Sequence, residues 1–155
     1  MLAFCRGELY NRTAVEKFPN TLALAVRNAS RNGVSERFTP LLGDVLTPVF
    51  LPDGEVYDAI LSNPPYIPHR VIEELEPELS SEPVAALDGG EDGLVFYRAI
   101  LASCKSRLRE NGFFLFEIGY DQAADLADIA KNEGFSMVRV LKDYGQNDRV
   151  VLIKR

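Results

Sequence analysis

The stretch Tyr57-Asp58-Ala59-Ile60-Leu61-Ser62-Asn63-Pro64-Pro65-Tyr66 joins a short apolar segment to a side-chain amide, two prolines and an aromatic ring. The apolar part is typical of a buried parallel strand. Each proline holds the residue before it in extended geometry, and neither proline has a backbone N–H. The loop after the strand therefore presents mainly carbonyl acceptors beside a flat ring, which suits the binding of a planar –NH2 group.

Strands and helices are predicted to alternate along the rest of the chain. Pro19 suits the first turn of a helix, apolar residues follow it at helical spacing, and Asn32-Gly33 ends the helix. A second helix is expected from about Gly93 to Arg109, ended by Asn111-Gly112. The same patterns predict a strand ending at Glu16, strands over 37–42, 57–61 and 113–118, and a helix over 121–133. This alternation favours an α/β fold with a parallel, doubly wound sheet.

Two segments depart from that alternation. The last two predicted strands, 137–141 and 149–153, are joined too closely for a parallel crossover, so we expect them to be antiparallel. The segment from His69 to Gly90 is acidic, contains two prolines and lacks clean periodicity. Long excursions of this kind usually serve function, and Asp88-Gly89-Gly90 within it is expected to form a tight turn that shapes a pocket floor.

Composition narrows the classes of partner. A length of 155 residues suits one domain, residues 1–155, and the net charge of −6 argues against a broad basic face for nucleic acid. No apolar run approaches the roughly 20 residues that span a bilayer, so no membrane partner is expected and the cytoplasm is the expected location. Two cysteines and one histidine do not make a metal site, so none is predicted. Cys104 falls on the apolar face of the second helix, which favours core packing.

Acidic or amide side chains follow the carboxyl ends of three predicted strands. These are Glu16, Asp44 and Asn63. Ligands of open α/β sheets bind beyond the carboxyl ends of the strands, where a carboxylate can accept hydrogen bonds from ribose hydroxyls. Each residue alone is also compatible with a helix cap or a solvated loop. Together, at successive strand ends, they favour a nucleoside site.

Four ordered blocks carry a resemblance to a known family. They are Ser62 to Pro68 followed by Glu82-Pro83, then Ala86 to Leu94, then Phe116 to Gln122, and finally Lys142-Asp143 with Asp148 to Val150. From Ala14 to Arg155 the chain resembles the class I S-adenosylmethionine-dependent methyltransferases. Within that group it is most similar to the release-factor glutamine methyltransferases, the PrmC/HemK family.

The resemblance implies a Rossmann-like sheet that binds S-adenosylmethionine. By position, Glu16 would bind the cofactor ribose and Asp44 the adenine edge, with Asn63 also at the cofactor site. The implied partner is a peptide chain release factor, whose Gly-Gly-Gln loop supplies the glutamine, and the product is N5-methylglutamine.

The resemblance also implies the roles of the loop that follows the 57–61 strand. Asn63 would accept a hydrogen bond from the substrate amide, and the Pro64 carbonyl would be the second acceptor. Tyr66 would pack against the flat substrate group, with Pro65 completing the substrate site. Asn63, Pro64 and Tyr66 are accordingly the expected catalytic residues, acting by positioning and electrostatics rather than by acid–base chemistry.

The match breaks at the N-terminus. The family's first strand and its glycine-rich loop have no counterpart, and Met1 to Tyr10 looks like the latter half of the helix that would follow that loop. In the family, this missing strand lies mid-sheet, between the strand that ends in Glu16 and the strand that ends at Asn63. Its loss predicts two unpaired strand edges and a slot that another segment, self-association of two chains or a different sheet closure must fill. We therefore expect an N-terminally truncated methyltransferase domain that binds its cofactor weakly.

Two alternative functions remain open. Asn-Pro-Pro-Tyr is shared with enzymes that methylate adenine, guanine or cytosine amino groups in nucleic acids, although the acidic balance and the block ending at Leu94 count against them. A degenerate module that keeps the fold and binds a partner without turnover is the other alternative, and the missing glycine-rich loop favours it.

Overall fold

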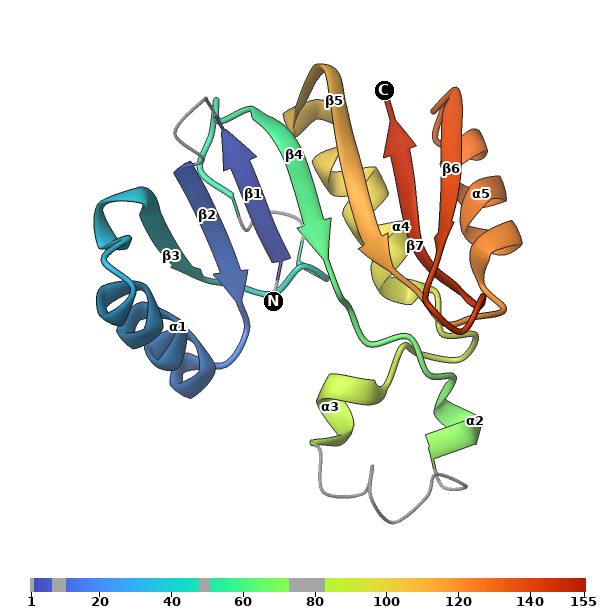
Figure 1. Ribbon diagram of the computed structural model, residues 1–155, viewed down its shortest axis with the longest axis horizontal. Helices are drawn as coiled ribbons and strands as arrows, with labels where there is room; N and C mark the ends of the chain where they lie inside the picture. The colour runs from blue at the N-terminus through green and yellow to red at the C-terminus, as the bar shows by residue number, and fades with distance from the viewer. Residues whose placement is uncertain (1, 7–10, 48–50, 73–82) are drawn as a thin grey trace.

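The computed structural model describes residues 2–6, 11–47, 51–72 and 83–155 of the chain. The described strands form one seven-stranded sheet in the order β3-β2-β1-β4-β5-β7-β6 (Figure 1). The strands are β1 Leu2–Arg6, β2 Asn11–Glu16, β3 Phe38–Leu42, β4 Tyr57–Ser62, β5 Leu108–Glu117, β6 Met137–Lys142 and β7 Asp148–Lys154. The helices are α1 Pro19–Arg31, α2 His69–Ile72, α3 Val84–Leu87, α4 Val95–Cys104 and α5 Ala123–Asn132, with 3-10 turns at Ser35–Arg37 and Lys105–Arg107.

Five of the seven described strands, β2 to β6, run in one direction and place their carboxyl ends at the same edge of the sheet. β2 pairs in parallel with β3, and β4 pairs in parallel with β5. β1 is antiparallel to both β2 and β4, so β2 and β4 share one direction. β7 is antiparallel to β5 and to β6, which confirms the predicted antiparallel C-terminal pair. The carboxyl edge of β2 to β5 is therefore the place where a ligand of this sheet would bind.

The expectation of a helix over Met1 to Tyr10 is wrong for the part of it that the structure describes. Leu2–Arg6 is a strand, while residues 1 and 7–10 lie outside the described residues. β1 fills the mid-sheet position, with Leu2 opposite Val15 on one side and Ser62 on the other. The two expected edges are thus paired by a segment of the chain itself, and self-association is not needed to fill a slot. The physical reason is that a short apolar segment beside two open strand edges gains ladder hydrogen bonds as a strand.

The helix expected over 93–109 is shorter than its pattern indicated. α4 ends at Cys104, one 3-10 turn follows, and β5 already begins at Leu108. Asn111 and Gly112 lie inside β5 rather than at a helix end, and Asn111 has a φ of 65°. The pairing of β4 with β5 jumps there from Leu108 to Phe113, so the extra residues form a bulge. The spacing of Leu108 also fits the apolar face of the expected helix. In the structure Leu108 is buried as the first residue of β5.

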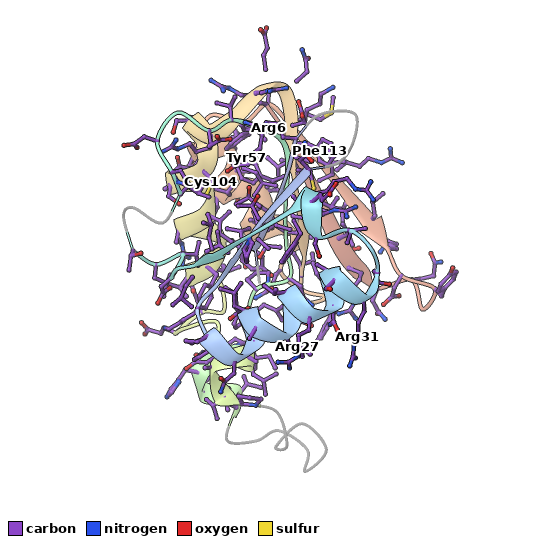
Figure 2. All side chains as sticks on the ribbon, turned by 90° about the vertical axis from the view of Figure 1, so that its left-hand side faces the viewer. Arg6, Arg27, Arg31, Tyr57, Cys104 and Phe113 are labelled. Carbon is purple, nitrogen blue, oxygen red and sulfur yellow. The ribbon has the colours of Figure 1, made fainter. Side chains whose placement is uncertain are left out.

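The core lies mainly between α4, α5 and the β4-β5-β7 part of the sheet. α4 buries Tyr97, Ile100, Leu101 and Cys104, so the prediction that Cys104 packs in the core is confirmed. α1 instead lies against β2 and β3 and buries only Ala29. Figure 2 shows α1 on the outside of the molecule, with Arg27 and Arg31 along it. Over the described residues, no helix combines the length and apolar character that a membrane span requires.

Candidate functional site: a cavity at the carboxyl edge of the sheet

A cavity of about 570 Å³ lies at the carboxyl edge of the sheet. Its walls come from the turns that follow β2, β3 and β4, and Phe96 and Ile100 of α4 add apolar surface. Leu2 at the start of β1 also lines it, because the antiparallel strand begins where its neighbours end. The volume lies within the range of roughly 300–1,000 Å³ typical of small-molecule sites.

Glu16 ends β2 at this cavity with little exposed surface, 7%. Its Oε1 accepts a hydrogen bond of 3.0 Å from the backbone N–H of Phe18, the residue before α1. The carboxylate therefore bonds to the residue ahead of α1 rather than capping the helix, which has no side-chain cap bond at this end, and it also faces the cavity. This hydrogen bond fixes the direction of the carboxylate at the strand end.

Asp44, two residues beyond β3, lies in the same cavity. Its Oδ2 lies 2.8 Å from Lys17 Nζ, and its Oδ1 accepts a hydrogen bond of 3.0 Å from the backbone N–H of Leu46. The bond from Lys17, followed by the bond from Leu46, holds the pKa of Asp44 below its usual range. Asp44 is therefore an anionic acceptor at neutral pH. The Lys17 side chain is 57% exposed, so it can leave the carboxylate when another donor arrives.

The residues after β4 form the third wall of the cavity. Asn63, Pro64 and Pro65 line it directly behind Ser62, the last residue of the strand. Asn63 is exposed while Pro64 is buried, so the amide side chain has room for a ligand and the backbone behind it is packed. The structure thus brings together five of the six residues named from the sequence: Glu16, Asp44, Asn63, Pro64 and Pro65.

Tyr66 does not share that cavity. It is partly buried against the core and lines a second, larger and more open cavity of about 1220 Å³. That cavity is bordered by the loop after β5, by α5 and by acidic side chains such as Asp121 and Asp125. The segment from Asn63 to Tyr66, which we call the acceptor corner, therefore separates the two cavities. Its first three residues face one and Tyr66 faces the other.

The far end of the excursion between β4 and α4 is tied by backbone hydrogen bonds to Ile67, the residue directly after the acceptor corner. The Ile67 N–H donates to Leu87 O at 3.0 Å, and the Gly89 N–H donates to Ile67 O at 2.9 Å. Asp88 closes the turn, because its Oδ1 accepts a hydrogen bond from the Gly90 N–H at 2.9 Å. Gly90 has a φ of 86°, as a tight turn at this position requires. Residues 73–82 of the excursion lie outside the described residues.

His69 also contacts this turn, with Nδ1 at 2.9 Å from Asp88 Oδ2. The hydrogen bond from His69 and then that from Gly90 hold the pKa of Asp88 below its usual range. The His69 side chain is 72% exposed, so this contact lies at the surface of the molecule.

Gln122 is a residue to which sequence reasoning assigned no role. It is buried, its Nε2 donates to Tyr66 O at 3.0 Å and to Gly93 O at 3.2 Å, and its Oε1 accepts from the Gly119 N–H at 3.0 Å. The available signal was its place at the end of the Phe116 to Gln122 block. Only the tertiary structure shows that this block and the acceptor corner touch.

Several curated proteins similar to this chain share one name. A release factor glutamine methyltransferase of Agrobacterium fabrum is 42% identical over 137 residues, which is 88% of this chain and 46% of the relative. Proteins of the same name from Caulobacter vibrioides and Moorella thermoacetica are each 40% identical, over 89% and 92% of this chain. The chain is related by sequence to the release factor glutamine methyltransferases. It spans about half the length of these curated relatives, between 46% and 50%.

Solved structures agree on the fold. A methyltransferase from Pyrococcus furiosus superposes with a TM-score of 0.60 at 21% identity, over 92% of this chain and 60% of that one. The catalytic domain of hMettl16, solved with a MAT2A 3'UTR hairpin, superposes with a TM-score of 0.66 at 18% identity, over 92% of this chain and 54% of that one. At such identities the likeness establishes a Rossmann-like methyltransferase fold and nothing about substrate. No family model matches the chain.

Proposed function

We propose that this chain carries the catalytic site of an S-adenosylmethionine-dependent methyltransferase that acts on the side-chain amide nitrogen of a glutamine, in the Gly-Gly-Gln loop of peptide chain release factors. One observation carries the proposal: a single cavity gathers Glu16, Asp44, Asn63 and Pro64, from three different strand ends. The curated relatives named release factor glutamine methyltransferase support this choice of substrate.

The cavity fits the cofactor in size and in the placement of acceptors. Glu16 at the end of β2 would hold the ribose hydroxyls, and Asp44 would accept from the adenine amino group once Lys17 moves aside. Asn63 would border the cofactor site on the β4 side, while its side-chain oxygen would serve the substrate amide. When bound, S-adenosylmethionine supplies an electrophilic methyl group on a positively charged sulfur.

The acceptor corner would overcome the main chemical difficulty of the reaction, which is the weak nucleophilicity of the substrate nitrogen. An amide nitrogen is a poor nucleophile because its lone pair is delocalised into the carbonyl. The Asn63 side-chain oxygen and the Pro64 carbonyl would accept the two N–H groups, orient the nitrogen and stabilise the positive charge that develops on it. Positioning of this kind can supply several kcal/mol without a dedicated base. The proton that the nitrogen sheds then passes to water.

Tyr66 would act from the other side of the corner. Because it lines the larger cavity, we propose that the glutamine side chain reaches Asn63 and Pro64 past the Tyr66 ring, with Pro65 beneath it. The cofactor and the protein substrate would then approach the corner from different cavities.

Since the chain spans half the length of its relatives and lacks the glycine-rich loop, we expect weak cofactor binding and slow turnover from the 155 residues alone. Calorimetry on the purified chain tests this directly. Micromolar binding of S-adenosylmethionine would contradict the expectation.

The proposed function is tested by incubating the chain with methyl-labelled cofactor and either a release factor or nucleic acid, and then locating the label. Label on glutamine is expected. Asn63→Ala should reduce transfer by about 100-fold or more, as loss of one transition-state hydrogen-bond partner does, with cofactor affinity nearly unchanged. Asn28→Ala, at an exposed position of α1, is the matched control.

Each other outcome contradicts the proposal in a different way. Near-wild-type turnover by Asn63→Ala would remove the acceptor corner from the reaction. Label in nucleic acid would favour an amino-group methyltransferase of bases, and cofactor binding without transfer to any substrate would favour an inactive module.

A further inference from the structure

We propose that Gln122 is a positioning residue that holds the acceptor corner in register with the cavity, an inference that rests on the proposed function of that corner. Gln122 does not line the smaller cavity, and it borders the larger one beside Tyr66 with little of its surface exposed. It acts through the backbone of Tyr66, the last residue of the corner.

The side-chain amide of Gln122 joins three separate parts of the chain. Its donor side reaches Tyr66 O after β4 and Gly93 O before α4, at 3.0 Å and 3.2 Å. Its acceptor side takes the N–H of Gly119 after β5 at 3.0 Å. Every one of these partners is a backbone group, and Gln122 itself is only 6% exposed. A buried amide with this many backbone partners fixes their relative positions, because displacing any of them leaves a buried polar group unpaired.

The packing around the Tyr66 backbone leaves no space for the acceptor corner to shift. A Cβ built at Gly93 would lie 2.4 Å from Tyr66 O and 2.7 Å from Gln122 Nε2. A Cβ built at Gly89 would lie 2.7 Å from Tyr66 Cα. The backbone of Tyr66 therefore lies in close contact with Gly89 and Gly93, and its carbonyl accepts a hydrogen bond from the Gln122 amide.

Position is transmitted from Tyr66 back to Asn63 because the two prolines between them have fixed φ angles. Proline also restricts the residue before it, so neither Asn63 nor Pro64 can easily rotate to absorb a shift. A displacement of the Tyr66 carbonyl consequently moves the Pro64 carbonyl and the Asn63 side chain, the two proposed acceptors.

A titratable side chain in contact with this amide is that of Tyr97. Its hydroxyl donates to Glu117 O at 2.8 Å and lies 3.5 Å from Gln122 Oε1. Burial raises the pKa of Tyr97 far above its usual value. The hydroxyl therefore keeps its proton throughout the pH range of the test below.

The test uses Gln122→Glu, which keeps the shape and the acceptor but, when ionised, has no proton to donate to Tyr66 O and Gly93 O. Burial should raise the pKa of the introduced carboxyl, so that lowering the pH restores a donor. The Asn63 side-chain amide resonances should shift at pH 8 and return toward the wild-type position at pH 5.5. Gln146→Glu, at the chain's other glutamine, makes the same change on an exposed turn and should leave the Asn63 resonances in place at both pH values.

Activity gives a second readout. Relative to wild type, Gln122→Glu should lower kcat about tenfold or more at pH 8, with less than a threefold change in the cofactor's dissociation constant, and the deficit should shrink at pH 5.5. Should the glutamate variant fail to fold, Gln122→Met replaces it with an uncharged side chain of similar size, and the Asn63 shift should then persist at every pH.

Unmoved Asn63 resonances in a folded but destabilised Gln122 variant would overturn the proposal and leave Gln122 a purely structural residue. The resonances are read without turnover, so their outcome stands apart from that of the proposed function. A wild-type chain with no transferase activity but with the pH-dependent Asn63 shift would refute the function and retain the positioning role.

Discussion

The half of the sheet beneath α4 and α5 differs sharply from the half beside α1. In the first half, α4 alone buries four side chains, and Phe114 and Phe116 of β5 stack with ring centroids 5.7 Å apart. In the second half, α1 buries only Ala29 and leaves Leu24 and Val26 exposed. The proposed acceptor corner is anchored to the dense half, while Glu16 and Asp44 belong to the thin half. Groups that must aim at a reacting nitrogen need rigid support, whereas carboxylates that hold a ribose or a base tolerate adjustment.

Thiol labelling should show the largest difference between the halves, since the chain has one cysteine in each. Cys104 is fully buried, and burial raises its pKa to about 11, whereas Cys5 on β1 is half-buried. At pH 8 the raised pKa lowers the thiolate fraction roughly 200-fold below that of an ordinary thiol of pKa about 8.5. Burial adds the cost of opening the core. Cys5 should therefore react with a maleimide or a disulfide reagent roughly 1,000-fold faster or more.

Mass spectrometry after timed labelling of the native chain measures this ratio, and labelling in denaturant is the control because there both thiols should react. Comparable native rates at the two sites would mean that the α4 half opens as easily as the α1 half.

Truncation of one side chain in each half should show the same contrast in the free energy of unfolding. Phe116 is fully buried and meets Tyr97 edge-on, with centroids 5.4 Å apart. Phe116→Ala should reduce the free energy of unfolding by about 3–5 kcal/mol. Leu24→Ala, on an exposed position of α1, should change it by less than about 0.5 kcal/mol. Urea unfolding followed by circular dichroism measures both, and equal losses would abolish the distinction between a dense and a thin half.

Two glycines with nearly the same φ angle allow the effect of packing on stability to be measured apart from that of backbone strain. Gly93 has a φ of +77° at the acceptor corner, and Gly54 has a φ of +79° with nothing within 4 Å of a built Cβ. Alanine at either position carries the cost of a left-handed backbone, about 1–2 kcal/mol. Only Gly93→Ala must also displace Tyr66 O, so we expect it to lose about 1–3 kcal/mol more than Gly54→Ala in urea unfolding. Equal losses of unfolding free energy in the two variants would show that the acceptor corner accommodates the methyl group at position 93 at no extra cost.

The smallest effect concerns the pH dependence of stability at the turn beneath the corner. The pKa of Asp88 is lower in the folded chain than in the unfolded one, chiefly because of the hydrogen bond from His69. The unfolded chain then binds more protons at acid pH. The stability that Asp88 supplies is thus complete above the ordinary carboxyl pKa of about 3.9 and is lost as the pH falls through the lower folded-state value.

Asp88→Asn should accordingly be less stable than wild type at pH 7 and lose less stability between pH 5 and pH 3. Because His69 is largely exposed, we expect a difference below about 1 kcal/mol. Asp53→Asn makes the same charge change on a fully exposed side chain and is the reference. If Asp88→Asn lost as much stability as wild type between pH 5 and pH 3, Asp88 would not contribute to the acid dependence of stability.

The sequence by itself determined the α/β alternation, the antiparallel C-terminal pair and the three acceptor positions at strand ends. These depend on local signals: apolar runs, prolines with fixed φ, and polar residues directly behind a strand. The gathering of Glu16, Asp44 and Asn63 followed from a general rule, because parallel strands end at one edge.

Only the tertiary structure decided what the first residues form and how the acceptor corner is held. Leu2–Arg6 pairs with two strands distant in sequence, and no local pattern states that their edges are open. The same holds for the bulge at Asn111-Gly112 and for the contact of Gln122 with Tyr66, which lies 56 positions earlier in the chain. Pairings between distant segments are set by which edges and buried backbone groups still need partners once the sheet has formed, and that need is a property of the whole fold.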